Sequence, residues 1–319
     1  MTSDQFQLQF PIPEELLRIP DGSSVSEADA VLAENGRTSH GYKEGKYFLP
    51  NDPVCRIAFG EDDGHRLRNF QPEQDRLDFQ HQMFIMALDG RLALAPMTSS
   101  PSTVLDVGTG TGIWAIQFGK PPSRHVNCEF IKTDAEDEWA FPRLPKFDYV
   151  HLRLVCMAFA NPKLVLRHAW DNLTPGGWVG YRDMWPCAMS YDGSHEGTVM
   201  QQYWDALRQG LSAQGRDPTV TLQYKDWLIE AGFAEVKGIA LDLPGNAWPN
   251  DYKLKRIGQY MYTDLYEDVR GAGWQLLRGM GWLPEQVEDL VARFKTDSRD
   301  EKYRVFYRMH IVYGRKPQD

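Results

Sequence analysis

Three glycines alternate with other residues directly after an apolar run that contains an acid. Residues 104–114 read VLDVGTGTGIW, in which Asp106 is followed by Gly108, Gly110 and Gly112. Glycine adopts positive φ without steric cost and lets a ligand approach the backbone, and a helix start exposes unpaired N–H groups. The spacing differs from the dinucleotide-binding pattern GxGxxG. The stretch predicts a strand, a ligand-binding turn and a helix, with the loop of some other α/β enzyme as the alternative.

Side chains suited to proton transfer lie elsewhere in the chain. His81 falls on a helix predicted after residue 71, and a histidine pKa near neutrality suits a general base, although packing is an equal alternative. Tyr47 lies in a segment that can cover a pocket as a lid, where an aromatic ring can face a cation, or it is an ordinary loop residue. Tyr181 and Asp183 end a predicted strand, where open α/β sheets contact substrates. Asp183 can equally cap a helix.

Composition excludes several classes of function. The net charge of −9 argues against nucleic acid or an anionic membrane as partner, because both need a basic face. The four cysteines form no CxxC pair, and His195-Glu196 lacks the second histidine of HExxH because Val199 stands there, so no metal is expected. The chain shows no signal-peptide pattern and no apolar run of about 18 residues, which predicts a cytoplasmic protein.

Strand and helix patterns alternate along the chain. Period-two or apolar runs predict strands, and apolar residues three and four apart predict helices. This alternation indicates an α/β fold with a parallel sheet covered by helices on both faces. The expected strands are 104–107, 126–133, 147–154, 178–184, 239–243 and 305–313, and the expected helices are 71–90, 113–119, 161–173, 200–211, 222–233 and, with glycine-rich breaks, 251–296.

An ordered set of short motifs resembles one known family, the fungal LaeA-like class I S-adenosylmethionine (SAM)-dependent methyltransferases. The likeness covers most of residues 35–316, and many motifs in one order are more specific than any single one. The motifs are NGR at 35–37, GKY at 45–47, LPND at 49–52, EQDRLD and QH within 73–81, LDVGTGTGIWAI at 105–116, DAEDEW at 134–139, FD and HLR within 147–153, LTPGGW at 173–178 and VYGRKP at 312–317.

The resemblance implies a Rossmann-like methyltransferase sheet with a helical insertion before the last strand. Residues 1–70 would form an N-terminal arm and lid, and residues 71–319 the methyltransferase-like domain. The cofactor would be SAM, with the three glycines under its amino-acid part and Asp106 steadying the turn or meeting the ammonium group. Asp134 and Ala135 would meet the adenine, and Arg153 would face the mouth of the active site.

The region after the glycine turn departs from the family pattern. The family has a complete second strand that ends in an acid, followed by a helix, whereas this chain has only KPPSRHVNCEFIKT, and residues 53–71 are an extra stretch. The second strand and helix are therefore expected to be shortened or lost, or the two departures reflect a misplaced gene boundary. By spacing, Glu129 could bind the ribose of SAM; by motif, which is the preferred interpretation, it lies inside the third strand.

These features predict methyl transfer from SAM to O, N or C of a small natural-product acceptor of hydrophobic or aromatic character. The abundant aromatic residues, such as Trp274 and Trp282, suit either such a pocket or a core. The first alternative is a methyltransferase-like cyclase or isomerase that no longer methylates. The second is a LaeA-like regulator that acts by binding a partner and could be nuclear.

Overall fold

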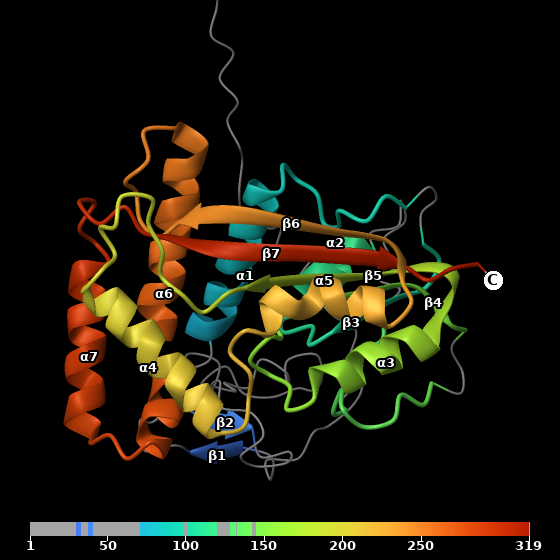
Figure 1. The fold of residues 1–319 in the computed structure, drawn as a ribbon, viewed down its shortest axis with the longest axis horizontal. Helices are drawn as coiled ribbons and strands as arrows, with labels where there is room; N and C mark the ends of the chain where they lie inside the picture. The colour runs from blue at the N-terminus through green and yellow to red at the C-terminus, as the bar shows by residue number, and fades with distance from the viewer. Residues whose placement is uncertain are drawn as a thin grey trace, which may run out of the picture.

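A five-stranded sheet with helices against both faces forms the centre of the molecule (Figure 1). The structure is a computed structural model that describes residues 30–32, 38–40, 71–97, 101–119, 128–131, 133–141 and 145–318. β3, β4 and β5 are parallel, as predicted, and β7 runs antiparallel to both β5 and β6. The strand order is β3 (Val104–Val107), β4 (Phe147–Arg153), β5 (Leu173–Met184), β7 (Phe306–Arg315) and β6 (Ala234–Pro244).

The helices follow the predicted pattern closely. In the described ranges they are α1 (Gln71–Ala87), α2 (Ile113–Phe118), α3 (Pro162–Asn172), α4 (Val199–Ala213), α5 (Val220–Glu230), α6 (Tyr252–Gly279) and α7 (Pro284–Asp297). None of them is both long and apolar enough to cross a bilayer. An antiparallel pair, β1 (Ala30–Leu32) and β2 (Thr38–His40), precedes them. The rest of the predicted arm and lid lies outside the described residues.

Local signals in the sequence set the helix ends. At the start of α3, the side chain of Asn161 accepts a hydrogen bond from the Leu164 amide at 3.2 Å, and Pro162 occupies the first turn. At the end of α1, Gly90 takes a positive φ of 83° and its amide donates to the Ile85 carbonyl at 2.8 Å. Both ends lie where the capping residues predict them.

The two faces of the sheet are covered by different helices because side chains alternate along each strand. In β4, Val150 and Leu152 face one way and are buried in a core with α3 and α5. Tyr149 faces the other way and packs with Trp114 of α2. Figure 1 shows α4, α6 and α7 gathered at one end of the sheet, where Met184 at the end of β5 packs against their core. This helical bundle therefore lies at the carboxyl end of the parallel strands.

The predicted strand over residues 126–133 is wrong. Cys128–Ile131 and Thr133 are coil, and within the described residues β3 pairs only with β4. The ring of Phe130 packs directly on Gly112 instead, so that a Cβ at Gly112 would lie 2.7 Å from it. The segment is thus held beside the glycine turn by apolar contact rather than by a sheet ladder.

Candidate cofactor and active site

The glycine turn follows β3 at the carboxyl edge of the sheet. Gly108, Gly110 and Gly112 have φ of 72°, 59° and 77°, a region that side chains rarely adopt. Gly108 and Gly110 are exposed, and a Cβ at Gly110 would meet no atom nearer than the Leu77 side chain at 3.9 Å. The turn therefore presents bare backbone that a ligand can approach, as the spacing predicts.

Asp106 anchors this turn from the strand. One carboxylate oxygen accepts a hydrogen bond from the Thr109 hydroxyl at 2.8 Å, within the turn itself. The other lies 2.8 Å from His151 Nδ1. Because a carboxylate only accepts, the imidazole proton lies on Nδ1 and Nε2 is an acceptor. The ring of Trp114 stacks on this imidazole at 3.7 Å between centroids and fixes its plane.

His81 does not have the environment of a general base. It is fully buried on α1, with Nδ1 2.7 Å from Arg153 Nη1 and Nε2 3.0 Å from Gln117 Oε1. Burial, together with the Arg153 charge, lowers the pKa of His81 to about 4. Both ring nitrogens are thus occupied by the chain, and the imidazole is neutral at physiological pH. His81 instead positions the side chain of Arg153. The Arg153 guanidinium also lies 5.6 Å from the centre of the Phe84 ring.

The lowered histidine pKa values predict acid sensitivity. Burial also lowers the pKa of His151 to about 4, whereas both histidines titrate near 6.5 in the unfolded chain. Between these values the unfolded state binds more protons, so stability falls as the pH drops from about 6.5 to about 4, by at most about 1.4 kcal/mol per pH unit for each histidine. Burial raises the pKa of Asp183 from 3.8 to about 6, which opposes part of this loss over that interval.

Substituting His81→Asn is expected to reduce the dependence of unfolding free energy on pH. Urea unfolding of both proteins near pH 8, 6 and 5 measures it, because at pH 8 the histidine is neutral in both states and the difference reports lost contacts alone. The unfolding free energies of the unsubstituted protein and the His81→Asn variant should become more similar as the pH falls. Parallel curves would contradict the lowered pKa.

Asp134 and Ala135 form a tight turn that is bound to the rest of the chain. Asp134 is 3% exposed, and its carboxylate accepts a hydrogen bond from the Glu136 amide at 2.9 Å. The Ala135 carbonyl accepts from Trp139 Nε1 at 2.8 Å and lies 3.3 Å from His168 Nδ1 of α3. The turn is therefore rigid, and the predicted adenine contact stays a prediction.

Glu129 lies between Cys128 and Phe130, and Phe130 packs against the glycine turn. Phe130 covers Gly112, and the carboxylate of Asp106 is near enough to Cys128 to raise its thiol pKa, after burial as the larger cause. Glu129 itself is exposed and in coil. The preferred motif interpretation, a place inside a strand, is therefore wrong, and the spacing interpretation, in which Glu129 binds the ribose, stays a prediction.

Comparison with known proteins gives the family. A family model described as a methyltransferase domain matches residues 79–237. Methyltransferase pytC of Aspergillus terreus is 27% identical over 319 positions, covering 93% of this chain and 92% of that protein. Protein-methionine methyltransferase laeA of Emericella nidulans is 28% identical over 324 positions, covering 93% of this chain and 80% of that protein. The chain belongs to the LaeA-like class I methyltransferases. SAM is the cofactor of this family.

Likeness to solved structures is weaker. A SAM-dependent methyltransferase of Thermotoga maritima overlaps with a TM-score of 0.41 and 15% identity, covering 79% of this chain and 99% of that one. This level of likeness adds nothing to the family assignment of the methyltransferase.

Asp183 and Tyr181, which the sequence predicts as substrate contacts at the end of β5, are both buried in the core of this methyltransferase. Asp183 is fully buried, and its carboxylate accepts hydrogen bonds from the Val155 amide at 2.7 Å and the Tyr224 hydroxyl at 2.6 Å. Tyr181 stacks on Tyr224 in the same core. Asp183 thus ties β5 to the chain after β4 and to α5, and the predicted substrate contact is corrected to a structural one. Tyr47 lies outside the described residues.

Two polar residues on buried strands of this LaeA-like methyltransferase are not among the predicted site residues. His151 and Arg182 are 1% and 2% exposed, on neighbouring strands and on the same face of the sheet as Tyr149. Their positions could have indicated them, because a charged or polar residue is uncommon within an apolar parallel strand and needs a hydrogen-bond partner when buried.

Proposed function

We propose that this chain transfers a methyl group from SAM to a small hydrophobic or aromatic acceptor of secondary metabolism. The observation that carries the proposal is the turn of three left-handed glycines, two of them exposed, at the carboxyl end of β3. Bound SAM supplies a methyl group made electrophilic by its sulfonium. The chain then has to hold and orient the donor and acceptor and keep water away.

The residues present fit the cofactor. The backbone at Gly108 and Gly110 is exposed and carries no side chain, so the amino-acid part of SAM can approach it. A side chain at either position would be strained by the positive φ. Glu129 offers an exposed carboxylate beside the turn, and two carboxylate oxygens suit the two ribose hydroxyls. Both carboxylate oxygens of Asp106 interact with Thr109 and His151, so Asp106 stabilises the conformation of the turn.

The acceptor class rests on the relatives, because the aromatic side chains of the helical bundle are packed in its core. Relatives named for methyl transfer include pytC, and laeA is named both a protein-methionine methyltransferase and a secondary metabolism regulator. The helical bundle at the carboxyl end of the parallel strands is rich in aromatic and apolar side chains. Trp274 and Met261 are buried in its core, at 6% and 0% exposure, so they shape the bundle rather than line an open pocket.

Calorimetry with SAM tests the proposal. We expect the full chain to bind SAM and, with extracts of aromatic metabolites, to produce species heavier by one methyl group in mass spectra. Turnover that is unchanged when SAM is removed would contradict methyl transfer and indicate a cyclase or isomerase. A chain that does not bind SAM would overturn the proposal directly.

The Glu129→Gln substitution is expected to weaken SAM binding by about 10-fold or more, because a hydrogen bond to a charged group contributes about 1.5–3 kcal/mol. Glu138→Gln is the matched control, since it removes the same charge from an exposed acid further along the same connection. Calorimetric dissociation constants for the two variants should differ by that factor. Equal constants would remove Glu129 from the cofactor site while leaving SAM binding itself intact.

A further inference from the structure

Arg153 is the last residue of β4 and lies beside the start of the glycine turn. The residue before it, Leu152, pairs with Val107 at the end of β3, so Arg153 is level with Gly108. The residue after it, Leu154, has a φ of 54°, a left-handed conformation that is unfavourable for a leucine. Strained residues of this kind cluster at binding and active sites.

Two carboxylates that hydrogen-bond to the glycine turn also act on the Arg153 charge. Asp106 accepts from the Thr109 hydroxyl at 2.8 Å, and Asp78 of α1 accepts from the Thr111 hydroxyl at 3.0 Å. Burial lowers the pKa of the Arg153 guanidinium, and the negative charges of these two acids oppose that shift. The guanidinium therefore lies close enough to the turn to interact with a ligand bound there.

The Arg153 side chain is held from α1 and keeps donors for a ligand. Nη1 donates to Nδ1 of the neutral His81 at 2.7 Å, and the other ring nitrogen, Nε2, lies 3.0 Å from Gln117 Oε1. Within the residues that the structure describes, the bond to His81 is the only hydrogen bond of this guanidinium, and Arg153 is only partly buried. A guanidinium has several N–H donors and no acceptor, so the remaining donors can bind an anion.

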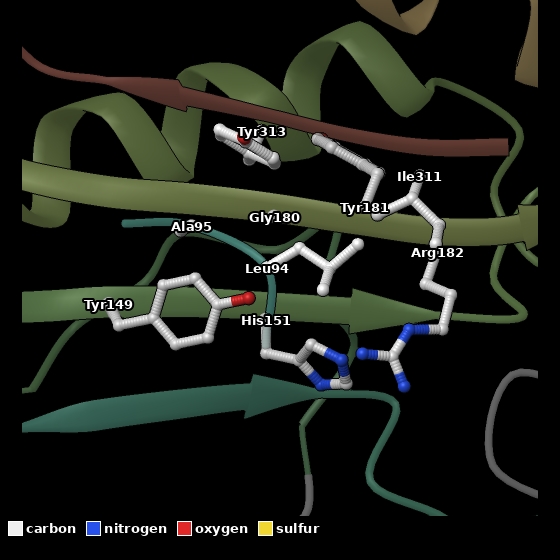
Figure 2. A pocket seen from close by; sticks show the side chains of 9 residues that line it. All are labelled: Leu94, Ala95, Tyr149, His151, Gly180, Tyr181, Arg182, Ile311 and Tyr313. Atoms are coloured by element: carbon white, nitrogen blue, oxygen red, sulfur yellow. The ribbon is translucent and has the colours of Figure 1, made fainter. Parts of the chain in front are cut away.

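The neighbouring cation on β5 has a different environment. Arg182 pairs with Arg153 across the two strands, but it is 2% exposed and donates to the Leu92 carbonyl at 2.7 Å. Figure 2 shows its side chain beside His151 at one end of a small cavity in the sheet. Burial lowers the pKa of Arg182 to about 10, and the Arg153 charge adds to this effect. Two adjacent cations favour an anion at the more exposed one, which is Arg153.

We propose that Arg153 binds a carboxylate group at the glycine turn. A planar guanidinium can donate two parallel hydrogen bonds to a carboxylate, which is a stronger and more specific pairing than a bond to a neutral group. The proposal rests on the proposed function, which supplies two sources of the carboxylate: the amino-acid part of SAM, and an acceptor that carries an acid group. A sulfonium or an ammonium group in this place would be repelled.

Calorimetry with SAM and with decarboxylated SAM tests the cofactor as the source. Decarboxylated SAM keeps the sulfonium and the amino group and lacks only the carboxylate. The unsubstituted chain should bind it at least about 10-fold more weakly than SAM, whereas Arg153→Gln should bind the two ligands with similar constants. The first comparison does not depend on how a variant folds. If the variant lost the same affinity for both ligands, Arg153 would have a structural role and this source would be contradicted.

Benzoate and benzamide test an acceptor as the source. Both are titrated into the full chain loaded with S-adenosylhomocysteine. Benzoate that binds at least about 10-fold more tightly than benzamide, with a preference that Arg153→Gln abolishes, would assign the carboxylate to the acceptor. If neither SAM nor benzoate gained affinity from its carboxylate in a way that depends on Arg153, the proposal would be overturned.

Two further variants complete the test. Arg315→Gln is the matched control, because Arg315 is also partly buried but pairs with Trp178 near the start of β5, at the opposite edge of the sheet, and donates to the Gly176 carbonyl at 3.1 Å. It should bind every probe like the unsubstituted chain. Arg153→Lys keeps the charge without the planar fork and should recover part of the preference for the carboxylate. Methyl transfer is assayed separately, so a chain that selects the carboxylate but transfers no methyl group would contradict the proposed function alone.

Discussion

Replacing Gly258 with alanine is expected to destabilise the protein by about 3 kcal/mol or more. Gly258 lies near the start of α6, and a Cβ there would be 1.8 Å from the Asn246 carbonyl oxygen and 2.6 Å from its carbon. The loop cannot move away easily, because the buried side-chain amide of Asn246 donates to the carbonyls of Ser298 and Tyr303 at 3.2 and 3.3 Å. Urea unfolding measures the loss.

Gly279→Ala is the control for Gly258→Ala, in the same helix. A Cβ at Gly279 would meet only Gln214 Nε2, at 3.7 Å, which is ordinary contact. Alanine there should be neutral or stabilise by about 0.5–1 kcal/mol. If both substitutions had the same effect, the close approach of α6 to Asn246 would not be a feature of the fold.

The second large effect is expected from Asp264→Ala, which removes the buried acid between α1 and α6. Asp264 is 2% exposed and accepts hydrogen bonds from Arg76 at 2.6 Å and Gln80 at 2.8 Å. The substitution leaves the Arg76 charge poorly paired, since Asp268 is 3.8 Å from it. We expect a loss of about 3 kcal/mol in the free energy of unfolding, together with weaker packing of α1 against α6.

A double-mutant cycle measures the interaction energy between Arg76 and Asp264 separately from their contacts with other residues. Arg76→Met in the Asp264→Ala background should recover part of the loss, with a coupling of about 1–3 kcal/mol, because the buried cation that lost its 2.6 Å carboxylate partner is then gone. Asp289→Ala serves as the comparison, since Asp289 and Arg293 form an exposed pair within one helix and should contribute about 0.5 kcal/mol or less. A coupling no larger than in that exposed pair would contradict the role assigned to Asp264.

Several elements of this methyltransferase follow from short-range sequence signals. The three glycines after Asp106 predict the left-handed turn, since each has a positive φ that side chains avoid. Asn161-Pro162 predicts the start of α3. Helix 251–296 was expected to break at its glycines, yet α6 runs unbroken through Gly258 and the chain turns only after Gly279. A glycine in a helix can mark close packing as well as a break.

The glycine turn, the alternation of strands and helices and the family could all be predicted, because residues close together in the chain specify each of them. Only the folded structure shows that Cys128–Ile131 is coil and that Phe130 packs against Gly112. It also decided that His81 faces Arg153, and that His151 and Arg182 share one cavity. The reason is that residue patterns specify which face of an element is apolar, whereas burial and long-range neighbours set partners and pKa values.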